Sequence, residues 1–198
     1  ADDGGAGTDR GVGFSEQLQR RVARIADLRG RRAGAKRLKL SGILGGTFDP
    51  VHIGHAQLAR DALQALNLDS VRCVPAGQPP HRTLPQATAE ERLAMVRLAL
   101  GEEPGCVIDD TEIRQTGPSW TIRTLERLWQ VEPETAHVLI LGADAWLGLP
   151  TWHRWQALLN FAHIAVANRP GADLALGTMP VALQSVWAAA HTTDLARL

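Results

Sequence analysis

The sequence predicts an α/β fold in which a parallel sheet carries helices on both of its faces. Short apolar runs alternate with segments of helical periodicity from Leu38 onward, and this alternation is typical of βαβ units. The chain has 198 residues, of which 44% are hydrophobic. This is enough for one domain with a substantial core.

Five short apolar runs are predicted to be the strands. They are residues 37–46, 71–76, 106–113, 137–142 and 163–168. Helices are predicted after His52, in 87–100 and in 120–129. Thr88 and Glu91 would form a capping box at the start of the second helix, and Gly101 would end it. Ser119 or Thr121 is predicted to cap the third.

Residues 1–37 are predicted to be a separate basic extension that is partly flexible. The first dozen residues are rich in Gly and Asp, and apolar residues then recur at helical spacing between 14 and 28, with arginines on the other faces. Residues 1–40 hold 10 Lys and Arg against 5 Asp and Glu, a net charge of +5 in a chain whose total is zero. A solvated extension is favoured over a docking helix or a nucleic-acid arm, because no aromatic residue lies between the arginines.

Composition indicates a cytoplasmic protein. No stretch approaches the roughly 20 apolar residues of a membrane-spanning helix, and the first residues lack a secretory pattern. Cys73 and Cys106 lie in separate apolar runs without C-x-x-C spacing. This favours buried thiols in a reducing compartment over a disulfide or a zinc site.

Four unusual polar segments follow predicted strands, at residues 45–55, 75–82, 114–121 and 142–155. In a parallel sheet, ligands bind outside the carboxyl ends of the strands, in the loops that lead to the helices. All four segments are therefore expected at the same edge of the sheet.

The first of these segments, GGTFDPVHIGH, has a composition suited to binding phosphate. Gly45 and Gly46 allow a close approach to the backbone, and Pro50 shapes a turn. His52 and His55 are three residues apart at a helix start, so both rings share one face beside free backbone N–H groups. Such donors would stabilise the charge on phosphoryl oxygens during an in-line displacement.

A metal site is the alternative interpretation of the histidine pair. No cysteine cluster or third ligand accompanies the pair, and the turn displaces Asp49. The Walker sequence G-x-x-x-x-G-K-[ST] is also absent. We therefore expect phosphate binding and no metal site built from side chains.

The segment GGTFDPVHIGH (45–55) resembles the (H/T)-x-G-H signature of the nucleotidyltransferase superfamily. PPHR (79–82), GPSWTIRTL (117–125), GADAWLGLPTWHRW (142–155) and NRPG (168–171) follow in the order typical of bacterial nicotinate-mononucleotide adenylyltransferases. The resemblance covers about residues 38–175. It implies a Rossmann-like nucleotidyltransferase fold and transfer of AMP from ATP to nicotinate mononucleotide. The products would be deamido-NAD and pyrophosphate, in NAD biosynthesis, with Mg²⁺ bound through the ATP phosphates.

The resemblance also implies roles for individual residues. His52 and His55 would be the catalytic pair. The ATP-binding residues would be Gly45, Gly46, Thr47, Phe48, His52, His55, Gly142 and Asp144. The nicotinate mononucleotide-binding residues would be His81, Arg82, Thr121, Trp152 and His153.

Several of these roles are more specific. Asp144 would bind the adenosine ribose hydroxyls, although an Asp at this position could also cap a helix. Trp152 would stack on the pyridine ring, and Thr121 with the backbone N–H of His153 would hold the nicotinate carboxylate. The remaining tryptophans of these segments are assigned to packing: Trp120, Trp146 and Trp155.

One family segment has no convincing copy. The I-S-x-T-x-I-R type sequence, whose side chains contact ATP phosphates, is not recognisable before Leu198, so the domain in 38–198 is expected to lack its C-terminal segment. Two alternatives stay open: a non-catalytic nucleotide-binding homologue, and another enzyme with this signature, such as pantetheine-phosphate adenylyltransferase. The expected partners are ATP and nicotinate mononucleotide, with no nucleic acid or membrane, and homo-oligomerisation is left open.

Overall fold

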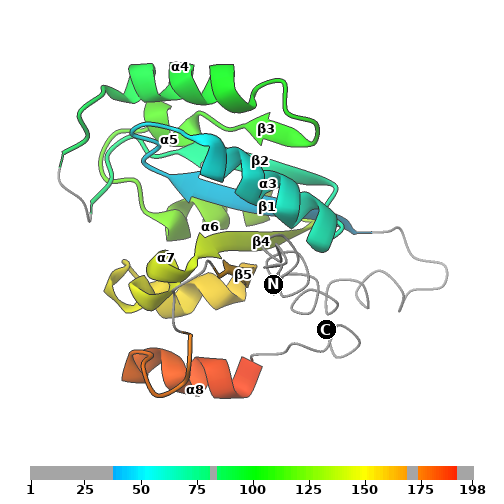
Figure 1. The fold of residues 1–198 in the computed structure, drawn as a ribbon, viewed down its shortest axis with the longest axis vertical. Helices are drawn as coiled ribbons and strands as arrows, with labels where there is room; N and C mark the ends of the chain where they lie inside the picture. The colour runs from blue at the N-terminus through cyan, green and yellow to red at the C-terminus, as the bar shows by residue number, and fades with distance from the viewer. Residues whose placement is uncertain (1–37, 81–83, 169–173, 191–198) are drawn as a thin grey trace, which may run out of the picture.

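The predicted α/β fold is confirmed by a computed structural model that describes residues 38–80, 84–168 and 174–190. Five parallel strands form one sheet in the order β3-β2-β1-β4-β5 (Figure 1). They are β1 (Lys39–Gly46), β2 (Ser70–Pro75), β3 (Cys106–Ile108), β4 (Thr135–Gly142) and β5 (Ala162–Ala167). The predicted N-terminal extension, residues 1–37, lies outside the described residues.

Helices connect the strands and cover both faces of the sheet, as predicted. They are α3 (Ile53–Ala65), α4 (Ala89–Leu100), α5 (Thr111–Arg114), α6 (Thr121–Val131), α7 (Ala143–Leu147) and α8 (Val181–Ala190), with 3₁₀ turns η1 (Leu149–Thr151) and η2 (Trp155–Asn160). Among the described helices, none is long and apolar enough to cross a membrane.

Two hydrophobic cores lie on opposite faces of the sheet. Successive side chains of a strand point to opposite faces, so Leu44 of β1 packs with α3 and α4, whereas Ile43 packs with α6, α7 and α8. The face of α3 toward the sheet consists largely of alanines, which allows the helix to lie close to the strands. A Cβ atom at Gly42 would come within 2.8 Å of the Leu68 and Ile140 side chains, so a larger residue here would displace the ends of these side chains.

The capping box at α4 is confirmed. The backbone N–H of Glu91 donates to Thr88 Oγ1 at 3.2 Å, and that of Thr88 donates to Glu91 Oε2 at 2.8 Å. Gly101 is the C-cap of the helix. The predicted cap of α6 is wrong, because its N-cap is Trp120 and makes no side-chain capping bond.

The predicted strand 106–113 is too long. β3 ends at Ile108, and the one-turn helix α5 follows. The Asp109 carboxylate accepts the backbone N–H of Thr111 at 2.9 Å and also the Thr111 hydroxyl. This local bonding competes with the sheet ladder and turns the chain into α5.

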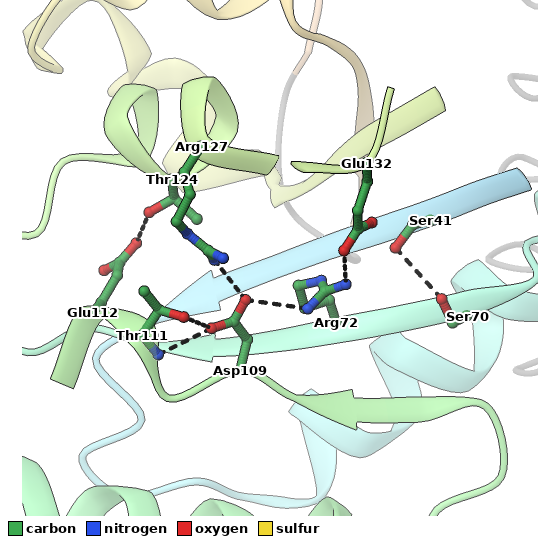
Figure 2. A network of polar contacts seen from close by, with 9 residues as sticks. All are labelled: Ser41, Ser70, Arg72, Asp109, Thr111, Glu112, Thr124, Arg127 and Glu132. Atoms are coloured by element: carbon green, nitrogen blue, oxygen red, sulfur yellow. Dashed lines mark hydrogen bonds and ion pairs between the residues drawn. The ribbon is translucent and has the colours of Figure 1, made fainter. Parts of the chain in front are cut away.

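Asp109 is also the centre of a polar network that joins β2, the end of β3 and α6 (Figure 2). Its carboxylate lies 2.7 Å from Arg127 Nη2 and 3.2 Å from Arg72 Nη1, and Arg72 Nη2 lies 2.6 Å from Glu132. Burial opposes ionisation of Asp109, but the bonds from Thr111 and Arg127 outweigh burial and lower its pKa. The network therefore fixes α6 against the sheet.

Candidate functional site

The described parts of the four polar segments lie at one edge of the sheet, as predicted, because all five strands are parallel. The chain passes from β1 to β2 on one side and later returns to β4 on the other side of β1. At such a reversal of strand order, ligands bind outside the carboxyl ends of the strands in open α/β sheets. The predicted residues His81 and Arg82 lie outside the described residues.

The two histidines of the first segment lie together at the start of α3. The ring centroids of His52 and His55 are 3.9 Å apart, and the Phe48 ring lies 4.9 Å from that of His55. The backbone N–H of His52 donates to His55 Nδ1 at 3.2 Å. A neutral His55 ring therefore carries its proton on Nε2, where it can donate to a ligand.

His55 is neutral at physiological pH. Burial and the neighbouring imidazole of His52 lower the pKa of His55 from 6.5 to about 4. A polyphosphate bound beside the ring would favour the protonated form, because opposite charge raises the pKa of an imidazole. The pair can thus act as hydrogen-bond donors to anionic oxygens.

The lowered pKa of His55 predicts an acid sensitivity. Above pH 6.5 the ring is neutral in both the folded and unfolded states; below it, only the unfolded state binds the proton, and stability falls until about pH 4. The full change in pKa from 6.5 to about 4 corresponds to about 3 kcal/mol of folding stability, and solvent screening at this half-buried ring reduces the expected loss to about 1–2 kcal/mol. Urea unfolding at pH 7 and pH 4.5 should show this extra loss in the wild-type protein but not in His55→Asn. Parallel pH dependences of the two proteins would contradict it.

The loop after β1 is held by contacts to the start of α4. Gly45 is exposed, and Phe48 is buried with a positive φ of 52°. Asp49 and Pro50 form the predicted turn. The Asp49 carboxylate accepts the backbone N–H groups of Gln86 at 2.5 Å and Ala87 at 3.2 Å. The loop thus has a defined shape before any ligand binds.

Sequence reasoning missed a role for Ser119. Its hydroxyl accepts the backbone N–H groups of Gly77 at 2.8 Å and Gln78 at 3.1 Å, which ties the loop after β2 to the segment before α6. The buried carboxyl of Glu112 accepts the Thr124 hydroxyl (Figure 2), and burial raises its pKa. A serine just before a helix resembles an N-cap in the sequence, and no local pattern reveals these distant partners.

Aromatic residues connect the third and fourth segments. Trp120 stacks on the ring of His153, with centroids 3.8 Å apart and planes inclined by 20°, and the Arg123 guanidinium lies 4.5 Å from the Trp120 centroid. Trp120 is half-buried, so its assignment to packing alone is incomplete. Trp146 and Trp155 are buried in the core, as predicted.

The other predicted residues of these segments lie at the starts of α6 and α7 and after η1. Thr121 is the first residue of α6 and is half-buried. Trp152 follows η1, is half-buried and packs against the second core. Asp144 is exposed in the first turn of α7, whose N-cap is Gly142. The structure thus places Asp144 beyond the carboxyl end of β4, and Thr121 near His153.

No group of three or more His, Cys, Asp or Glu side chains that could hold a metal ion is found within 38–80, 84–168 and 174–190. Imidazoles, hydroxyls and backbone N–H groups are among the polar groups at the carboxyl edge. These are donors suited to phosphate and carboxylate oxygens.

The sequence matches proteins of known family. The family model for cytidylyltransferase-like proteins matches residues 43–197. A probable nicotinate-nucleotide adenylyltransferase of Dechloromonas aromatica is 46% identical over 155 residues, which are 78% of this chain and 71% of that protein. One of Aeromonas hydrophila is 53% identical over 130 residues, 66% of this chain and 61% of that protein.

Solved structures share the fold. Plasmodium falciparum nicotinic acid mononucleotide adenylyltransferase complexed with NaAD gives a TM-score of 0.63 at 16% identity, over 70% of this chain and 69% of that one. Its complex with APC gives 0.59 at 14% identity, over 70% and 68%. At these identities the likeness shows the arrangement of the elements alone.

Proposed function

Because the chain belongs to the nicotinate-nucleotide adenylyltransferase family, we propose that it transfers the AMP group of ATP to nicotinate mononucleotide. The observation that carries the proposal is the pairing of His52 and His55 at the start of α3, beside the glycine loop that ends β1. Relatives at 46% and 53% identity bear this activity in their names. These relatives favour the nicotinate enzyme over the pantetheine-phosphate enzyme.

The reaction requires alignment of two polyanions and no protein nucleophile. A 5′-phosphate oxygen of the mononucleotide attacks the α-phosphorus of ATP, the bond to the bridging oxygen breaks, and pyrophosphate leaves with the electron pair. His52 and the Nε2–H of His55 donate to the phosphate oxygens as charge shifts toward the leaving group. The glycines at 45 and 46 let a phosphate approach the backbone.

We propose that Mg²⁺ arrives bound to the ATP phosphates. Carboxylates are sparse among the residues proposed to bind ATP, where Asp144 is the sole acidic side chain. A Mg²⁺ ion keeps several waters and is commonly bound through substrate phosphates with one or two carboxylates. When bound, the ion would neutralise phosphate charge, and the histidines would donate directed hydrogen bonds.

The proposed acceptor site lies between the third and fourth segments. Trp152 offers a flat face for the pyridine ring, and Thr121 with the backbone N–H of His153 would take the carboxylate. Asp144 would accept the ribose hydroxyls of ATP. His81 and Arg82 would hold the mononucleotide phosphate, an assignment that rests on the sequence resemblance. Because both substrates are multiply charged nucleotides, we also propose a cytoplasmic location.

The proposal is tested by incubating the full chain with ATP, Mg²⁺ and nicotinate mononucleotide and measuring pyrophosphate. Release that requires all three components is the expected result, with deamido-NAD as the second product. Binding of the mononucleotide without pyrophosphate release would contradict the proposal and favour a non-catalytic homologue. Reactions that lack one component each serve as controls.

A further inference from the structure

One buried arginine joins the two loops that follow β1 and β2. Arg92 lies on α4, and only 1% of its surface is exposed. Its Nη1 donates to the carbonyl oxygens of Thr47 at 2.7 Å and Ala76 at 2.6 Å, and its Nη2 donates to that of Gly77 at 3.1 Å. Its Nε donates to the carbonyl of Ala87 at 3.3 Å. A single guanidinium therefore bonds to the loop after β1 and to both ends of the loop after β2.

This use of a buried charge differs from an ordinary ion pair. Burial lowers the pKa of Arg92, with Asp49 and Glu90 opposing that effect, and a guanidinium stays protonated in proteins. Its hydrogen-bond partners are backbone carbonyls, which cannot be exchanged by mutation or by rotation of a side chain. Burying a charge costs free energy that an apolar residue would avoid, and neighbouring inward positions on α4 are indeed Leu93 and Val96.

The two joined loops carry different parts of the proposed reaction. Thr47 belongs to the loop that leads to His52 and His55, on the ATP side. Ala76 and Gly77 belong to the loop that Ser119 ties to the segment before α6, on the acceptor side. The backbone N–H of Ala76 also donates to the Gly46 carbonyl at 2.9 Å, so the loops already touch at their base.

We propose that Arg92 is a positioning residue that sets the distance between the ATP loop and the acceptor loop. This inference rests on the proposed function. Arg92 contacts neither substrate; it acts through the carbonyls of both loops. Alignment of two reacting groups is worth several orders of magnitude, and a misplacement of about 1 Å can cost about 10²-fold in rate. Loss of the guanidinium therefore affects turnover more than the binding of either substrate alone.

The test is Arg92→Lys, which keeps the positive charge but replaces a planar fork by a single ammonium donor. We expect kcat to fall about 10- to 100-fold, while the Kd of ATP alone and of nicotinate mononucleotide alone stays within about twofold. Arg97→Lys is the matched control, because Arg97 lies on the same helix, is exposed and pairs with Asp110. The control is expected to keep wild-type turnover.

A second variant covers the case in which Arg92→Lys does not fold. Arg92→Ala leaves space for a guanidinium ion, and millimolar guanidinium is expected to restore part of the turnover, whereas ammonium is not. Wild-type kcat in Arg92→Lys, a rise in both Kd values that accounts for the lost rate, or equal rescue by both ions would overturn the inference. Failure of the wild-type chain to release pyrophosphate would instead contradict the proposed function.

Discussion

The His52→Ala variant is expected to lose about 10²- to 10³-fold in kcat and to remain folded. Removing one preorganised donor at a site of developing negative charge has an effect of this size in other enzymes. His52 is exposed at the N-cap of α3, so its truncation leaves no cavity. Steady-state pyrophosphate release measures the loss, and thermal unfolding checks the fold.

Two further variants separate the loss of the hydrogen-bond donor at His52 from a general effect on helix α3. Gln57→Ala changes an exposed residue of the same helix, whose amide bonds to Asp61 at 2.8 Å, and should keep full turnover. His52→Asn retains an N–H donor and a good N-cap residue, so it should keep more activity than His52→Ala. A His52→Ala variant at the wild-type rate would refute the assignment of this histidine.

The sequence predicted the histidine pair because its geometry is local. Residues three apart at a helix start share one face wherever the helix lies in the fold. The Trp120–His153 stack joins residues of two different loops, and only the order of the strands brings those loops together. From the sequence, Trp120 is assigned to packing, and its partner His153 could not be predicted.

The strands were predictable for a related reason. Strands buried on both faces appear as continuous apolar runs, and four of the five end where the sequence pattern ends, within about two residues. β3 is the exception, because the carboxylate of Asp109 bonds the backbone of Thr111 and closes the strand early. Asp109 also has Arg72 and Arg127 as partners, and these lie on other elements of the fold.

Arg92 shows what sequence patterns omit. Arg92 and Arg97 lie on one helix, five residues apart. The sequence alone does not distinguish the environment of one arginine from that of the other. In the structure, Arg92 is buried among carbonyls while Arg97 forms an exposed ion pair. The distinction depends on the loops that pack over α4, which no local property of the helix specifies.

Nicotinate mononucleotide is expected to exceed nicotinamide mononucleotide in kcat/KM by at least about 10²-fold. α6 has 11 residues and no side-chain cap at its N-terminus, and the first N–H groups of a helix favour an anion. Thr121 provides a hydroxyl at the same point. A carboxylate would gain charge-assisted hydrogen bonds there, whereas an amide would turn its own NH₂ toward these donors and leave some unpaired.

Comparing the two mononucleotides with ATP and Mg²⁺ measures this ratio, and equal turnover would contradict carboxylate recognition. Thr121→Val keeps the shape of the side chain but removes its hydroxyl, so the ratio should fall about 10-fold, which is about 1.4 kcal/mol of discrimination. Thr116→Val, in the exposed part of the same loop, should leave the ratio unchanged. Because the N–H groups of α6 remain in Thr121→Val, part of the preference should persist; its complete loss would place the recognition on the hydroxyl alone.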